Sequence, residues 1–118
     1  MPKRKREIDT RPTFTYNGDP VRAGGCLFFI KHNNEIYYLL RKGKRDWGDI
    51  GGKTDTKDKC ITDTIIREVV EETNNVLLNE EHNTEEATNA LKYIINNTPK
   101  KIFYSQKSKY VLFVLELP

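Results

Sequence analysis

Long apolar runs are missing from this sequence of 118 residues. The longest largely apolar runs, CLFFI and YVLFVLEL, are far shorter than the roughly 20 residues that a membrane-spanning helix needs. The basic start, MPKRKRE, is not followed by the apolar segment of a secretory signal. We therefore expect an intracellular protein without membrane contact, cytoplasmic unless the stretch PKRKRE acts as a nuclear-import signal.

Cysteine and histidine are also scarce, with two of each in the chain. Cys26 and Cys60 do not have C-x-x-C spacing, and His32 and His82 stand alone. Neither a zinc site nor a disulfide framework is supported by such isolated residues.

An excess of one charge is absent outside the N-terminus. The net charge of +3 arises in residues 1–11, where five basic residues face two acidic ones, which leaves 15 of each sign in the rest. A nucleic-acid-binding face is therefore not indicated for the main part of the chain. We divide the chain into a basic, disordered N-terminal segment, residues 1–20, and one domain, residues 21–118. The basic tail is either a solvated terminus or a contact to nucleic acid.

Four runs rich in β-branched and aromatic residues predict two hairpins. VRAGGCLFFI and EIYYLLRK, joined by KHNN, form the first and supply core strands. KIFYS and YVLFVLEL, around the turn QKSK, form the second.

Two amphipathic helices are predicted between these hairpins. In the first, residues 58–73, apolar residues recur at helical spacing, with Asp58 or Thr56 as N-cap and Asn74 as a left-handed C-cap. The second covers residues 83–97, with Asn83 as N-cap and Pro99 beyond its end. We interpret the second as a packing helix.

The stretch GDIGGKT, residues 48–54, resembles a phosphate-binding P-loop but lacks its spacing. Trp47 stands where the first glycine of that motif belongs, and the charged run RKGKRD precedes it instead of a buried strand. We expect Gly51 and Gly52 to form a turn that brings the backbone close to the following helix, because glycine has no Cβ.

Three carboxylates share one face of the first helix. At 100° per residue, Glu68, Glu71 and Glu72 fall within one arc, and Glu72 borders the apolar stripe. Glu68 and Glu72, one turn apart, repel each other. Clustered carboxylate oxygens are what Mg²⁺ and Mn²⁺ prefer, so a divalent cation would relieve this repulsion. An ordinary charged helix face, with Arg67 paired to Glu71, is the alternative.

With these residues, the sequence resembles the Nudix hydrolases, whose motif is G-x5-E-x7-R-E-U-x-E-E-x-G-U, where U is a bulky aliphatic residue. The match is GKTDTKDKCITDTIIREVVEETNN, residues 52–75, in which REVVEE fits every position of R-E-U-x-E-E. Asp58 replaces the first glutamate, Asn74 the glycine and Asn75 the aliphatic residue, and Ile50 replaces a proline common before the motif. The segment from Gly52 to Arg67 is one residue longer than the pattern.

The resemblance implies an α/β fold, a Nudix-like α/β/α sandwich with a mixed sheet that lacks the usual C-terminal strand and helix. Residues 83–97 would be an inserted helix or a substitute for the missing one. The implied activity is that of a pyrophosphohydrolase, with Mg²⁺ or Mn²⁺ as cofactor, acting on a diphosphate linkage in a nucleoside diphosphate derivative or capped RNA. A catalytically inactive Nudix-fold module that binds ligand or regulates is the alternative, and the substrate and oligomeric state stay open.

The resemblance also assigns roles to residues. Glu68, Glu71, Glu72 and the Gly51 carbonyl would be metal ligands, and Glu68 is also the candidate general base. Arg67, placed with Glu68 and Glu71 in the catalytic set, would pair with Asp58 and hold the helix in position. Four basic residues flank the glycines and could bind substrate phosphate or simply form a solvated loop: Lys42, Lys44, Arg45 and Lys53.

Overall fold

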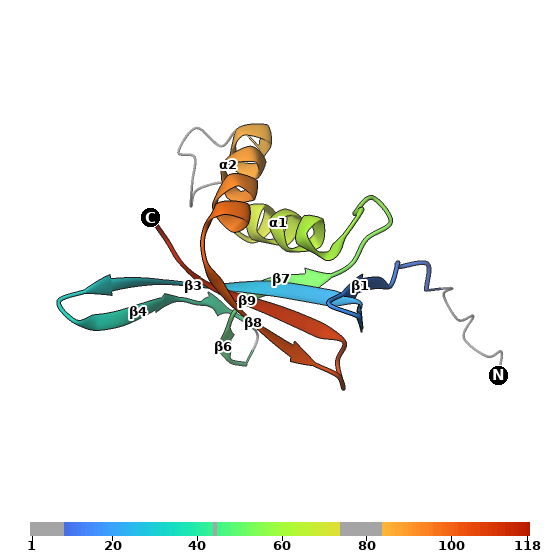
Figure 1. The fold of residues 1–118 in the computed structure, drawn as a ribbon, viewed down its shortest axis with the longest axis horizontal. Helices are drawn as coiled ribbons and strands as arrows, with labels where there is room; N and C mark the ends of the chain where they lie inside the picture. The colour runs from blue at the N-terminus through green and yellow to red at the C-terminus, as the bar shows by residue number, and fades with distance from the viewer. Residues whose placement is uncertain (1–8, 44, 74–83) are drawn as a thin grey trace.

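The computed structural model describes residues 9–43, 45–73 and 84–118, and these form an α+β domain with a mixed sheet and two helices (Figure 1). The sheet has five strands in the order β4-β3-β9-β8, with β7 also paired to β3. Strand β9 runs parallel to β3, and the other pairs are antiparallel. The strand bounds are β3 Ala23–His32, β4 Glu35–Leu39, β7 Ile50–Lys53, β8 Lys100–Ser105 and β9 Tyr110–Glu116.

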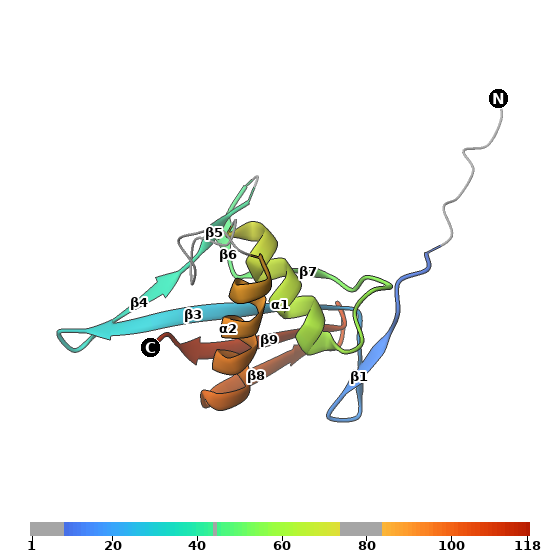
Figure 2. The same ribbon diagram turned by 90° about the horizontal axis from the view of Figure 1, so that it is seen from above.

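Both helices lie on the same side of this sheet, as Figures 1 and 2 show. Helix α1 spans Ile61–Glu72, and helix α2 spans Thr84–Asn97. Buried residues of α1 and α2 form one core cluster with every second residue of β9, namely Val111, Phe113 and Leu115. Helix α2 therefore adds to the layer of α1 and does not cover the other face of the sheet. None of the described helices is long and apolar enough to cross a membrane.

Both predicted hairpins are confirmed, and the structure adds a β1–β2 hairpin that was not predicted. Asn33 and Asn34, both with positive φ, connect β3 and β4. The same geometry at Asn17 and Gly18 connects β1 (Phe14–Tyr16) to β2 (Asp19–Val21). The expectation of disorder across residues 1–20 is thus wrong for this part, because an Asn-Gly pair favours the type I′ turn that closes a hairpin.

The prediction that both strands of the first hairpin belong to the core is wrong for β4. Ile36 is 51% exposed and Tyr38 is 53% exposed. Burial along β3 likewise stops after Phe28, and the outer half of the β3–β4 hairpin extends beyond the helices (Figure 2). The apolar composition of β4 therefore reflects its strand conformation and not coverage by a second layer.

Helix α1 begins later than predicted. Its N-cap is Cys60, and among the described residues no side chain caps it. Asp58 and Thr56 are wrong as caps, because Asp58 uses its carboxylate for contacts described below. At the other end, the Thr73 hydroxyl donates to the Val69 carbonyl oxygen at 2.7 Å. The expected caps Asn74 and Asn83 lie outside the described residues, and α2 ends before Pro99 as predicted.

The paired glycines lie inside a strand, not in the expected turn. Gly51 faces Gly25 and Gly52 faces Gly24 in the β7–β3 ladder. A Cβ on Gly24 would lie 3.0 Å from Ile65 of α1, and a Cβ on Gly51 would overlap the Gly24 carbonyl oxygen and the Tyr110 hydroxyl. The glycines are needed because backbone and side chains approach this ladder from both faces.

We expect Gly51→Ala to lower the free energy of unfolding by about 2 kcal/mol, because the added methyl overlaps backbone that cannot move aside. Urea-induced unfolding measures the change.

Gly48→Ala is the matched control, since a Cβ there would meet no atom within 4 Å. The control should unfold within about 0.5 kcal/mol of the unmodified chain. Equal stability of the two variants would contradict the close approach at Gly51.

Candidate acidic site on helix α1

Arg67 lies at the centre of the contacts between α1, the preceding loop and strand β7. Its Nε and Nη2 donate to the two Asp58 carboxylate oxygens at 3.1 and 3.0 Å. Nη2 also donates to the Lys53 carbonyl oxygen at 2.9 Å, and Nη1 donates to Glu68 Oε1 at 2.9 Å. The guanidinium group thus joins the residues that the sequence analysis paired, and it adds the end of β7.

Asp58 is almost fully enclosed, with a side chain that is 3% exposed. Besides the two bonds from Arg67, its carboxylate accepts the Thr64 hydroxyl at 2.7 Å and the Asp55 backbone N–H at 2.9 Å. Desolvation opposes ionisation of Asp58, but the hydrogen bonds from Arg67, Thr64 and Asp55 outweigh it and lower its pKa. The same bond to Asp58 raises the pKa of Arg67 further above its already high value. Both groups therefore stay charged at neutral pH.

Glu68 lies against the backbone of β7. A Cβ on Gly52 would lie 2.6 Å from either Glu68 carboxylate oxygen, so the absence of a side chain at Gly52 makes room for this carboxylate. Desolvation is the largest cause that raises the pKa of Glu68, and the charges of Glu71 and Glu72 raise it further, against the effect of Arg67. The three acids are therefore electrostatically coupled, and Glu68 accepts a proton more readily than an ordinary glutamate.

Glu71 and Glu72 are more exposed and face different arginines. The side chain of Glu71 is 52% exposed, and its Oε2 lies 3.6 Å from Arg67 Nη1. Glu72 Oε2 forms an ion pair with Arg41, with Nε at 2.7 Å. Arg41 belongs to β5 (Arg41–Lys42), which pairs with β6 (Trp47–Gly48) in a short ribbon. Sequence reasoning missed Arg41, because helix periodicity cannot predict which strand end meets Glu72.

The acidic face has the type of donor atom that a hard divalent cation prefers, but its carboxylates are not arranged around a common point. Its donors are carboxylates, with Gly52 backbone beside them, and such oxygen donors are what Mg²⁺ and Mn²⁺ prefer. Nevertheless, the described part of the chain holds no group of three or more acidic, histidine or cysteine side chains gathered as a metal site. Glu71 and Glu72 would have to turn from their arginines toward Glu68 to form one.

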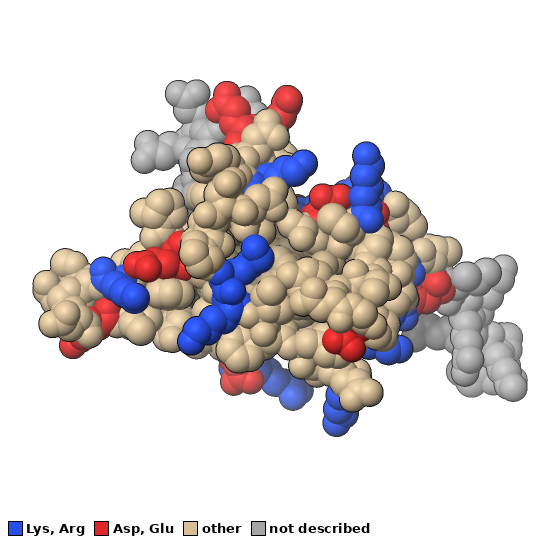
Figure 3. Space-filling model, viewed as in Figure 1, with Lys and Arg blue, Asp and Glu red and all other residues tan. Residues whose placement is uncertain are grey.

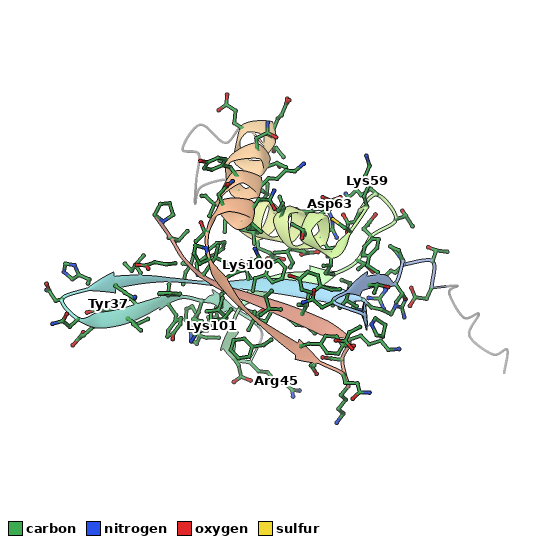
Figure 4. All side chains as sticks on the ribbon, viewed as in Figure 1. Tyr37, Arg45, Lys59, Asp63, Lys100 and Lys101 are labelled. Carbon is green, nitrogen blue, oxygen red and sulfur yellow. The ribbon has the colours of Figure 1, made fainter. Side chains whose placement is uncertain are left out.

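The predicted phosphate-binding residues do not come together on the acidic face. Lys42 Nζ lies 5.7 Å from the centre of the Trp47 ring, and Lys44 is outside the described residues. Arg45 lies on the side of the sheet away from α1 in the view of Figure 4. Lys53 directly follows Gly52, whose Cα faces Glu68, so the Lys53 side chain points to the opposite face of the sheet.

A second polar pair was not predicted. The Tyr110 hydroxyl of β9 donates to the Asp49 carboxylate across the face of β3 and β7 that lies away from α1. Desolvation, and then the Asp49 carboxylate, raise the pKa of Tyr110, so this hydroxyl stays protonated. Residues this far apart in sequence meet only through the parallel β3–β9 pairing. The only trace of this pair in the sequence is the glycines, Gly25 and Gly51, which leave room for the two side chains.

Gly51 itself faces Gly25 within the ladder, and a Cβ on it would overlap the Gly24 carbonyl oxygen and the Tyr110 hydroxyl. The structure thus places Gly51 one residue from the backbone that Glu68 touches.

Comparison of the chain with models of known families, with curated proteins and with solved structures gave no match. The resemblance to Nudix hydrolases therefore rests on the sequence motif alone.

We expect Asp58→Asn to lower the free energy of unfolding by about 2 kcal/mol at pH 7, because it leaves the largely enclosed Arg67 charge without its partner. Since the folded pKa of Asp58 is lowered, the pair stabilises the fold above the usual aspartate pKa, and this contribution is lost as pH falls through the lower folded value. Urea unfolding from pH 7 downward should show the difference between variant and unmodified chain shrinking below about pH 4.

Glu85→Gln, which removes an exposed carboxylate in the first turn of α2, is the control and should change stability by less than about 0.5 kcal/mol. An Asp58→Asn chain as stable as this control at pH 7 would show that the pair does not hold α1 in place.

Proposed function

We propose that the chain is a Nudix-type pyrophosphohydrolase that uses Mg²⁺ or Mn²⁺ to hydrolyse a diphosphate linkage. The observation that carries the proposal is the position of Glu68 against Gly52, with Arg67 bound to Asp58 and to the Lys53 carbonyl. The motif is one residue longer than the family pattern, yet its glycine strand and its acidic helix still meet. This contact supports a site built from both ends of the motif.

The finer fold that we propose is a Nudix-like α/β/α sandwich that lacks the usual C-terminal strand and helix, with residues 83–97 as an inserted helix. The sheet face opposite the helices carries apolar side chains around an open groove of about 780 Å³, among them Leu27, Phe29, Leu112 and Val114. The described residues place no helix there. An apolar sheet face is what a second helical layer covers in three-layer domains.

In this mechanism, Glu71, Glu72 and Glu68 would hold the cation, with the Gly51 carbonyl as a further ligand. A bound divalent cation supplies neutralisation of the diphosphate charge, polarisation of phosphorus and a lowered pKa of bound water. Glu68 has the raised pKa and the enclosed position of a general base, and its carboxylate would take a proton from the attacking water. Arg67 is a positioning residue that fixes Glu68 relative to β7.

The proposed substrates are small nucleoside diphosphate derivatives or capped RNA, which share the linkage to be cut. Of the predicted phosphate-binding residues, Lys42 is the candidate for a phosphate contact, because it lies on the β5–β6 ribbon whose Arg41 pairs with Glu72.

We expect Glu71→Gln and Glu72→Gln each to lower the hydrolysis rate at least about 100-fold, because each removes a charged oxygen donor from the cation. The assay is phosphate or nucleotide release with Mg²⁺ or Mn²⁺ over nucleoside triphosphates, dinucleoside polyphosphates, nucleotide sugars, capped RNA and inositol pyrophosphates.

A chelator should abolish turnover, and Glu85→Gln should retain it. If no substrate in this panel turns over, or if both variants keep the full rate, the chain is not such an enzyme.

One observation favours the alternative, a catalytically inactive Nudix-fold module that binds a ligand. Arg41 supplies Glu72 with a positive charge at 2.7 Å and so occupies a carboxylate that a cation would need. With this arginine, part of the negative charge of the acidic face is neutralised by the protein itself, without a metal ion.

Arg41→Gln separates the two functions. In an enzyme, it should tighten Mn²⁺ binding about fivefold, because the competing cation on Glu72 is removed. Titration calorimetry with Mn²⁺ measures this, and Lys31→Gln, at the far end of β3, is the control of equal charge change. Absence of Mn²⁺ binding in both the unmodified chain and Arg41→Gln, together with metal-independent nucleotide binding, would favour the inactive module.

A further inference from the structure

A groove of about 290 Å³ lies where β3 begins, β7 ends and the β8–β9 turn passes. Five basic residues line it, and among the described residues no acidic or aromatic side chain does. They come from four separate segments of the sequence, with two of them in the β8–β9 turn: Arg11, Arg22, Lys53, Lys107 and Lys109. Elsewhere, basic and acidic side chains are interspersed over the face shown in Figure 3. The groove is therefore a local concentration of positive charge in a chain that is close to neutral beyond its N-terminus.

Backbone hydrogen bonds bring these cations together. The Arg22 and Ala23 N–H groups donate to the Lys109 carbonyl oxygen at 2.8 and 3.3 Å. Ala23 also pairs with Lys53 in the β3–β7 ladder, and the Thr54 N–H donates to the Arg22 carbonyl oxygen at 3.1 Å. The groove is thus a product of the sheet itself and not of chance positions of long side chains.

The positive charge in the groove is only partly compensated. Asp9, at its edge, pairs with Arg11 at 3.2 Å and with Arg22 at 2.8 Å. Within the part of the chain that the structure describes, Lys53, Lys107 and Lys109 form no ion pair. Arg22 Nε is buried and has no hydrogen-bond partner among the described residues. Three ammonium groups therefore remain for an anion.

Lys109 occupies a backbone conformation that costs energy. Its φ is 50°, in the left-handed region, which disfavours residues with a Cβ by about 1 kcal/mol relative to glycine. A glycine would satisfy the turn better, but it would remove an ammonium group from the groove.

We propose that this groove binds a ligand that carries several linked phosphate groups. Arginine forks and lysine ammonium groups are the side chains that bind phosphate oxygens, and more than one phosphate is needed to match this number of cations. Recognition is through phosphate, since no described aromatic side chain lines the groove to stack on a base. Two sources offer this chemistry: a free polyphosphate chain and the backbone of a single nucleic-acid strand.

The groove is distinct from the acidic site. Glu68 lies on the α1 face of β7, and the Lys53 side chain points to the other face. Binding here needs no divalent cation and does not rest on the proposed hydrolysis.

The test is calorimetric titration of the full chain with inorganic tripolyphosphate in the presence of EDTA. The unmodified chain should bind, and binding should weaken as salt is raised because the attraction between exposed charges is screened. Lys109→Gly should weaken binding about fivefold through loss of one charge. Its melting temperature should be unchanged or higher, because glycine relaxes the left-handed turn.

Lys31→Gln is the matched control, with the same loss of charge at the other end of β3, and it should leave the affinity unchanged. Glu71→Gln should also bind tripolyphosphate normally, so failure of the hydrolase proposal would not affect this result. No binding by the unmodified chain, or equal weakening by Lys109→Gly and Lys31→Gln, would overturn the proposal.

A competing single-stranded oligonucleotide identifies the source of phosphate. A nucleic-acid backbone is supported if the oligonucleotide displaces tripolyphosphate from the unmodified chain and if Lys109→Gly weakens oligonucleotide binding as it weakens tripolyphosphate binding. Binding of tripolyphosphate without displacement supports a free polyphosphate.

Discussion

The close approach of α1 to the β3–β7 ladder is the constraint on which the rest of this structure depends. Gly24 lets Ile65 rest directly on the sheet, and Gly52 leaves space for the Glu68 carboxylate. At this distance Arg67 reaches both Asp58 and the Lys53 carbonyl. The core contact and the candidate site are therefore set by the same separation between helix and sheet, so a change in one alters the other.

The fold could be predicted from sequence wherever a local rule decides the structure. Apolar periodicity predicted α1, and alternating residues around QKSK predicted β8 and β9. Local rules failed where the exposure of a strand depends on an element distant in the sequence. The exposure of β4 depends on how far the helices extend along β3, which no pattern within residues 35–42 records. The hairpin at Asn17-Gly18, in contrast, has a local turn signal in its Asn-Gly pair, although its two strands have only three residues each.

The candidate site divides in the same way. Helix geometry placed Glu68, Glu71 and Glu72 on one face, and their electrostatic coupling agrees with that placement. The pairing of Asp58 with Arg67 was expected from the family resemblance alone. Arg41 could not have been foreseen, since it reaches Glu72 through the β5–β6 ribbon. Contacts within one helix follow from spacing, whereas contacts between distant segments depend on the whole sheet.

The late start of α1 at Ile61 has a consequence for chain length. Inside a helix, one extra residue would turn everything after it by 100° and would carry the three acids away from β7. Before the helix, at Lys59 and Cys60, an extra residue only lengthens a loop whose ends are tied by Arg67 and Asp58. The added loop entropy for such a residue is about 0.1 kcal/mol. A change of length in this segment therefore leaves the rotational phase of the helix that follows unchanged, whereas a change inside the helix does not.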